Sequence, residues 1–285
     1  MIPARNLPAR MADRLIVALD VPTVAQARAL VAKLDGVVSF YKIGMWLLYS
    51  SGTEAFIDEL LASGKRVFLD AKMHDIGETV RAGARAAAER GISFMTVHAE
   101  PQVVRAAMEG KKDGEGKGRA ALQILAVTVL TSLSDDDLAE IGYARTVPEL
   151  VTQRVNDVVA LGGDGVIASG EDNPDEIRRR ANAPNLLVVT PGIRPAGAEA
   201  GDQKRIATPA AAISRGADYL VVGRPIVTAP NPAAAARAII AEMERGATGD
   251  TSRGATGDTS RGATGVTIAA TSHASSAPPG PRPRR

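Results

Sequence analysis

Short apolar runs rich in β-branched residues recur along the chain, and each is followed by an Ala- and Arg-rich segment with helical periodicity. The runs lack strict alternation of apolar and polar residues, which is typical of parallel strands covered by helices. Their ends are spaced as successive β/α units require. We expect eight strands, at Arg14–Asp20, Val37–Ile43, Arg66–Ala71, Ser93–His98, Leu122–Val129, Gly165–Ser169, Leu186–Thr190 and Tyr219–Val222.

Capping residues mark the helices between these strands. Thr23 is a suitable N-cap, Gly64 and Gly91 are suitable helix ends, and several helices start with Pro in their first turn. The alternation predicts an α/β protein with a (β/α)8 TIM barrel in a single domain, because eight regular units fit closure better than an open doubly wound sheet. The predicted helices are Val24–Leu34, Thr53–Ala62, Val80–Arg90, Pro148–Leu161, Pro174–Ala181, Thr208–Arg215 and Pro232–Arg245.

Two kinds of segment lie outside this scheme. We expect an N-terminal arm over 1–12, the barrel over 13–245, and a disordered tail over 246–285 that repeats GATGDTSR and cannot build a core. The Gly-rich charged segment Gly110–Gly118 lacks the order of a phosphate-binding P-loop and precedes a strand, so we interpret it as a solvated connector.

Charge and composition narrow the class of protein. The formal charge is +2, but the tail holds five Arg and two Asp, so residues 1–245 carry one net negative charge. Nucleic-acid binding by the barrel is therefore not expected. The chain has no Cys, which excludes disulfides and thiol chemistry, and it has no apolar run long enough to span a membrane or form a signal peptide. We expect a cytoplasmic protein without membrane partners.

Charged residues gather where the predicted strands end, and the active sites of β/α barrels form at that end. Asp70 and Lys72 are two residues apart and should point to the same side. The lysines could hold a proton for delivery, and the aspartates could keep them charged. Barrel-mouth salt bridges are the alternative, but charges on successive strands favour an active site. The cluster comprises Asp20, Lys42, Asp70, Lys72 and Asp75.

The last two strands lead into loops that suit a phosphate group. The loops after strands seven and eight of such barrels bind phosphate through backbone N–H groups and Arg. Pro191 and Arg194 follow strand seven, and Gly223 and Arg224 follow strand eight. A long loop between Arg194 and Thr208 carries Gln203 and has the length of a lid. Simple turn chemistry and a plain surface loop are the alternatives.

Six short motifs follow one another along the predicted barrel: Leu19–Pro22, Lys42–Gly44, Asp70–Ile76, Thr190–Arg194, Asp202–Arg205 and Val222–Pro225. In this order and spacing, they resemble the orotidine 5′-phosphate decarboxylase family over roughly residues 13–245. Gly77 and Glu78 stand where many relatives have Pro and Asn, and Met73 replaces a common aromatic residue, but the charged members are intact.

The resemblance implies an enzyme that converts orotidine 5′-monophosphate to uridine 5′-monophosphate without a cofactor or metal. In such an enzyme Lys72 protonates C6 of the pyrimidine after carbon dioxide leaves, and Asp70 lies beside the substrate carboxylate. Lys42 and Asp20 bind the ribose hydroxyls and complete the charged chain. Thr131 contacts the pyrimidine.

The resemblance also implies a phosphate subsite and a homodimer. The groups that hold the 5′-phosphate are Arg194, Gln203, Gly223 and Arg224, with Pro191 in the same loop. Asp75, Ile76 and Thr79 reach into the site of the neighbouring subunit, so the two sites are shared.

Two rival functions stay open at this point. A Mg²⁺-dependent sugar-phosphate decarboxylase or aldolase of the same barrel type shares the Asp-x-Lys-x-x-Asp segment, although Lys42, Gln203 and the Thr-Pro-Gly-Ile-Arg loop favour the pyrimidine enzyme. A barrel that binds nucleotides without catalysis is the other. His98, at a strand end, is either packed in the barrel or a partner of a catalytic residue.

Overall fold

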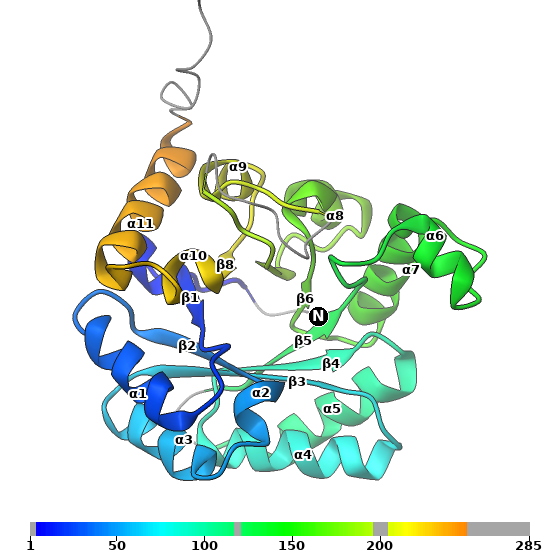
Figure 1. Cartoon of the computed structure of the whole chain (residues 1–285). Helices are drawn as coiled ribbons and strands as arrows, with labels where there is room; N and C mark the ends of the chain where they lie inside the picture. The colour runs from blue at the N-terminus through cyan, green and yellow to red at the C-terminus, as the bar shows by residue number, and fades with distance from the viewer. Residues whose placement is uncertain (1–3, 117–120, 196–204, 250–285) are drawn as a thin grey trace, which may run out of the picture. The chain divides into compact units, whose positions relative to one another are not determined.

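Eight parallel strands pair in chain order, and β8 pairs with β1, so the sheet closes into a barrel (Figure 1). The computed structural model describes residues 4–116, 121–195 and 205–249. Every predicted strand is present, mostly with trimmed ends, and the predicted TIM barrel is confirmed. The strands are β1 (Leu15–Ala18), β2 (Phe40–Gly44), β3 (Arg66–Met73), β4 (Phe94–His98), β5 (Gln123–Val127), β6 (Gly165–Ile167), β7 (Leu187–Thr190) and β8 (Tyr219–Val222).

Helices surround the strands, and each predicted helix is present within a few residues (Figure 1). The last helix continues three residues beyond its predicted end, to Thr248, so the predicted disordered tail is wrong for its first residues, 246–248. The rest of that prediction, from residue 250 on, lies outside the described residues. No helix in the described ranges is long and apolar enough to cross a bilayer. The α-helices are α1 (Val24–Lys33), α2 (Met45–Leu48), α3 (Thr53–Ala62), α4 (Gly77–Arg90), α5 (Pro101–Gly114), α6 (Asp135–Glu140), α7 (Val147–Ala160), α8 (Pro174–Arg180), α9 (Pro209–Ser214), α10 (Arg224–Val227) and α11 (Pro232–Thr248), with 3-10 turns η1 (Met11–Arg14) and η2 (Gly170–Asp172).

The predicted solvated connector at Gly110–Gly118 is wrong for its first half, which is the buried last turn of α5. A Cβ atom on Gly110 would lie 2.1 Å from the carbonyl oxygen of Arg81, so glycine is what lets α5 pack directly on α4. The charge in this turn is buried as well, because Lys111 Nζ lies 2.7 Å from Asp164 Oδ1. The run of Gly and charged residues predicts a loop from the sequence, but in the structure it forms a helix–helix contact.

The inside of the barrel is filled by large side chains. The rings of Phe40 and Phe94 meet edge to face with centroids 5.0 Å apart, and Phe94 and Tyr219 do the same at 5.0 Å. The Arg66 guanidinium lies 4.0 Å from the Phe40 centroid. A packed interior of this kind confines ligand space to the ends of the strands. The inner cluster is Ile16, Ala18, Phe40, Phe68, Phe94, Leu125, Leu187, Val189, Tyr219 and Val221.

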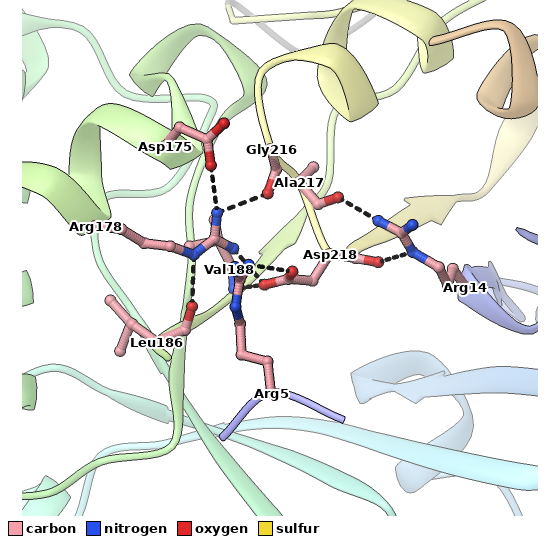
Figure 2. A network of polar contacts seen from close by, with 9 residues as sticks. All are labelled: Arg5, Arg14, Asp175, Arg178, Leu186, Val188, Gly216, Ala217 and Asp218. Atoms are coloured by element: carbon pink, nitrogen blue, oxygen red, sulfur yellow. Dashed lines mark hydrogen bonds and ion pairs between the residues drawn. The ribbon is translucent and has the colours of Figure 1, made fainter. Parts of the chain in front are cut away.

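An ion network around the buried Asp218 lies at the N-terminal end of the barrel, where β8 begins, and we call it the base network (Figure 2). The Asp218 carboxylate pairs with Arg178, accepts the backbone N–H of Val188 at 2.8 Å, and pairs with Arg5 at 2.8 Å. Arg14 donates to the backbone carbonyls of Asp218 and Ala217. The segment before β1 is thus fastened to the start of β8.

Candidate active site

A cavity of about 600 Å³ opens at the C-terminal ends of the strands. Its floor includes Phe68 at the top of the packed interior, and Met45 and Trp46 of α2 lie on its wall. The predicted site residues that line it are Asp20, Lys42, Asp70, Lys72, Thr131, Pro191, Arg194, Gly223 and Arg224. Residues from both ends of the barrel sequence therefore meet in one cavity, as the strand-end pattern predicts.

Asp70 is the centre of an alternating chain of charges. Its Oδ2 atom lies 3.0 Å from Lys42 Nζ and 2.8 Å from Lys72 Nζ. Lys42 Nζ also lies 3.0 Å from Asp20 Oδ1. The middle of the chain is the most buried part, since the side chains of Lys42 and Asp70 are each 10% exposed. Two carboxylates and two ammonium groups are thus held at the mouth with their charges nearly balanced.

Both central groups stay ionised. Burial by itself would raise the pKa of Asp70, but the ammonium groups of Lys42 and Lys72 and hydrogen bonds from Lys72 and Thr96 outweigh it and hold the pKa at about 2. Burial would likewise lower the pKa of Lys42, but Asp70 and Asp20 raise it above its ordinary value. A carboxylate with so low a pKa carries no proton to deliver at neutral pH, so Lys72 is the better proton donor beside it.

The backbone at Lys72 is unusual. Its φ angle is +44°, in the left-handed region that side-chain-bearing residues rarely adopt. The pairing of β3 with β4 shifts register between Leu69 and Met73, so Lys72 lies within the irregular stretch. This irregularity re-aims the end of β3 into the cavity, which is a common role of strand irregularities beside active sites.

The loops after β7 and β8 form the opposite wall. Gly192 has φ +73°, and Gly223 precedes Arg224, the first residue of α10. A Cβ atom on Gly223 would lie 3.6 Å from Ala18 Cβ, so β1 is close to this turn. Arg194 is buried and donates to the carbonyl of Ile193 at 2.9 Å. Two Arg side chains and two Gly turns therefore face the cavity together, an arrangement that suits an anion.

One predicted phosphate ligand, Gln203, lies outside the described residues. The described end of the same loop is held by Arg205, whose guanidinium lies 2.6 Å from Asp172 Oδ1 and donates to the carbonyl of Val129 at 3.1 Å. The sequence places Arg205 in one of the family motifs but does not indicate a role for it. Its contacts tie the loop after β7 to the segments that follow β5 and β6.

Asp75, Ile76 and Thr79 do not line the cavity of their own chain. They lie in the loop after β3 and the first turn of α4, and all of them are exposed. Ile76 is 74% exposed, which is unusual for a large apolar side chain, and its N–H donates to Asp75 Oδ1 at 2.6 Å. That these residues complete the site of a neighbouring subunit stays a prediction.

His98 lies in a small cluster beside the site. The imidazole rings of His98 and His74 have centroids 5.1 Å apart, and the potential ligand atoms of both rings and of Glu100 lie within 4.8 Å of one another. Glu100 already pairs with Arg154 at 2.9 Å. Burial lowers the pKa of His98, the Glu100 carboxylate opposes this shift, and the charges of His74, Arg154 and Lys72 add to it. The one carboxylate of the cluster is thus already paired with a guanidinium, and we assign no metal to this cluster.

The fold and the cavity define a β/α-barrel enzyme with a charged network at the C-terminal mouth and Arg-bearing loops after its last two strands. The chain belongs to the orotidine 5′-phosphate decarboxylase / HUMPS family, whose model matches residues 13–239.

Individual relatives agree with this assignment. Two proteins named orotidine 5′-phosphate decarboxylase, from Afipia carboxidovorans and Methylorubrum populi, are each 52% identical to this chain, over 83% and 81% of it and 97% and 96% of their own lengths. The crystal structure of orotidine 5′-phosphate decarboxylase from Lactobacillus acidophilus is 38% identical, with a TM-score of 0.71 over 81% of this chain and 99% of that one. An uncharacterised conserved protein from Geobacillus kaustophilus is 31% identical, with a TM-score of 0.69.

Proposed function

We propose that this protein decarboxylates orotidine 5′-monophosphate to uridine 5′-monophosphate in the synthesis of pyrimidine nucleotides, without a cofactor. The observation that carries the proposal is the chain Asp20–Lys42–Asp70–Lys72 at the mouth of a family barrel. The decarboxylases among the relatives, about half identical over most of the chain, support the same reaction.

The charged chain suits a decarboxylation that has no electron sink. When carbon dioxide leaves, the electron pair of the broken bond stays on C6 of the pyrimidine, and the protein must stabilise that charge directly. The Lys72 ammonium can do so and then donate its proton to C6. Lys72 keeps a side-chain exposure of 36% in the cavity, which leaves it accessible to a substrate.

Asp70 contributes by repelling the substrate carboxylate, but this effect is limited. At ~4 Å and an effective dielectric of about 20 the repulsion is worth roughly 4 kcal/mol. Since each ~1.4 kcal/mol is a factor of ten in rate, it supplies about three decades at most. The larger share must come from charge that is already arranged around the transition state, and from binding energy of the phosphate used to close the site.

The remaining roles follow the family and are part of the proposal. Lys42 and Asp20 bind the ribose hydroxyls, and Thr131 contacts the pyrimidine. The phosphate is held by Arg194, Gln203, Gly223 and Arg224 beside Pro191. The protein acts as a homodimer, in which Asp75, Ile76 and Thr79 complete the site of the neighbouring subunit.

The decisive experiment follows the absorbance of orotidine 5′-monophosphate in the presence of the purified full-length protein, with and without excess chelator. We expect the absorbance to fall at the same rate in both conditions. A rate that the chelator abolishes would favour the Mg²⁺-dependent sugar-phosphate reaction type. Nucleotide binding measured by calorimetry without any loss of absorbance would favour a non-catalytic barrel and overturn the proposal.

A further inference from the structure

A threonine inside the barrel wall contacts both catalytic residues of β3. Thr96 is the central residue of β4 and is 1% exposed. Its hydroxyl donates to Asp70 Oδ1 at 2.8 Å and accepts the backbone N–H of Lys72 at 3.0 Å. One hydroxyl therefore uses its single donor on the carboxylate and an acceptor site on the main chain of the proton donor.

These contacts lie where the regular pairing between β3 and β4 is interrupted. β3 and β4 pair regularly up to Leu69 and Met95, and the next pair is Met73 with Val97. Between these two pairs β3 advances by four residues and β4 by only two, so β3 has two extra residues here. Lys72, with its left-handed φ of +44°, lies in this stretch. The Thr96 side chain therefore accepts the Lys72 N–H within the stretch of β3 that has no paired residue on β4.

We propose that Thr96 is a positioning residue for decarboxylation, which fixes the Asp70 carboxylate and the Lys72 main chain relative to one another. This inference rests on the proposed function. The two oxygens of Asp70 are used differently: Oδ2 receives both ammonium groups, at 3.0 Å from Lys42 and 2.8 Å from Lys72, and Oδ1 receives Thr96. Without the hydroxyl, Oδ1 loses its donor and the carboxylate is free to rotate away from Lys72.

The pKa of Asp70 distinguishes a positioning role of Thr96 from a role in packing alone. The Thr96 hydrogen bond is one of the interactions that lower the pKa of Asp70. Its removal should raise that pKa, whereas a purely structural defect in the barrel wall should leave it unchanged. Thr96 carries no sequence signal for such a role, because it lies inside a strand and not at its end.

The test is Thr96→Val, which keeps the shape and removes the hydroxyl, with Thr96→Ser as the variant that restores it. A lost hydrogen bond to a charged group corresponds to about a ten- to hundredfold effect. We therefore expect kcat to fall about ten- to hundredfold in Thr96→Val, with a much smaller change in KM, and to return to within about threefold of the original enzyme in Thr96→Ser. Carbon-13 NMR titration should show a higher Asp70 pKa in Thr96→Val only.

Thr128→Val is the matched control. Thr128 is also fully buried in the barrel wall, but its hydroxyl donates to the carbonyl of Ile167 at 2.8 Å, and the residue does not line the cavity. This variant should lose stability and keep its kcat and Asp70 pKa. If Thr96→Val does not fold, Thr96→Ala and Thr96→Ser give the same comparison, since they differ by one oxygen.

An unchanged kcat and an unchanged Asp70 pKa in Thr96→Val, or an equal loss of kcat in Thr96→Ser, would overturn the inference. If the unmodified protein does not turn over orotidine 5′-monophosphate, the proposed function fails, and the NMR titration still decides whether Thr96 controls Asp70. The two proposals thus fail in distinguishable ways.

Discussion

Asp70 and Asp218 are buried carboxylates at opposite ends of the same barrel, exposed by 7% and 0% respectively. Each pairs with two cationic side chains, Lys42 and Lys72 for Asp70, and Arg5 and Arg178 for Asp218. Each also accepts a further hydrogen bond, from the Thr96 hydroxyl or the Val188 N–H. Counting ion pairs does not tell which of the two serves chemistry.

The difference lies in what else the cations contact. At the base, Arg178 also donates to the carbonyls of Leu186 and Gly216, at 2.9 and 2.8 Å (Figure 2). At the mouth, Lys72 has three N–H donors, and within the described residues it uses one of them, on Asp70. The cations of the base network do not line the cavity, and Arg5 ends that network at the surface with 29% of its side chain exposed. The mouth network ends in the Lys72 ammonium, which faces the cavity. A network whose last donor points into ligand space is a candidate for catalysis.

Replacement of Lys72 should have the largest effect. Lys72→Ala removes the proton donor and the charge nearest the cavity, so we expect kcat to fall by at least about a thousandfold, with a smaller change in nucleotide affinity. Thermal unfolding should shift little, because Asp70 keeps Lys42. Lys111→Ala is the control: this buried lysine pairs with Asp164 away from the cavity, so its loss should lower stability and spare kcat. Near-normal turnover in Lys72→Ala would remove the mouth network from the mechanism.

Asp218→Asn should have the opposite signature. The substitution leaves the partly desolvated guanidinium of Arg178 without its buried counter-charge, and breaking such a pair costs about 3–5 kcal/mol in the free energy of unfolding. The folded fraction should retain its kcat, because every partner of Asp218 lies at the base. Denaturant unfolding and activity per folded molecule measure the two effects. A loss of kcat at unchanged stability would show that the base network is not purely structural.

The charged network at the mouth could be predicted from the sequence, because its residues lie near the ends of predicted strands, where the active sites of β/α barrels form. Strand ends are recognisable where an apolar run stops, and Asp20, Lys42 and Asp70 fall at or one residue before the ends of the predicted strands. In the structure β2 and β3 continue two and three residues beyond Lys42 and Asp70. The barrel geometry then brings these ends together without any knowledge of side-chain contacts. The fold could be predicted as well, because the spacing of apolar residues along each short segment indicates whether that segment forms a strand or a helix.

The base and the positioning contact could not be predicted in this way. Arg5, Arg178 and Asp218 are far apart in the chain and carry no motif, so only the closure of the barrel shows that they meet. Thr96 looks like any polar residue in a strand, and its role depends on a shift of register that the sequence does not announce. The glycines of α5 predict a loop from the sequence, but in the structure they let α5 pack closely on α4. Glycine is common in both situations, so the sequence alone does not separate them.

The charges of the mouth network should make the stability of the protein depend on pH, with an effect between those of Asp218→Asn and Arg5→Ala. The pKa of Asp70 is lowered from 3.8 to about 2, so its ionised form stabilises the fold above its unfolded pKa, and this contribution is lost as the pH falls through the folded pKa. The shift corresponds to about 2 kcal/mol. We expect the difference in unfolding free energy between the original protein and Asp70→Asn to be constant above about pH 5 and to shrink between about pH 4 and 2. A difference that does not change with acid would contradict the assigned shift.

Arg5→Ala should have the smallest effect, and it tests how independent the two ends are. Arg5 lies on the outer side of the base network, with 29% of its side chain exposed, and Asp218 keeps Arg178 and the Val188 N–H when Arg5 is removed. We expect a loss of about 1 kcal/mol in the free energy of unfolding, as for a partly exposed ion pair. Arg10→Ala, which affects a side chain that is 74% exposed and 3.9 Å from Asp13, is the control and should change nothing measurable. kcat should be unchanged in both variants. If Arg5→Ala lowers kcat instead, a strain at the base reaches the mouth through β8, and the separation of the two networks into structure and chemistry would be wrong.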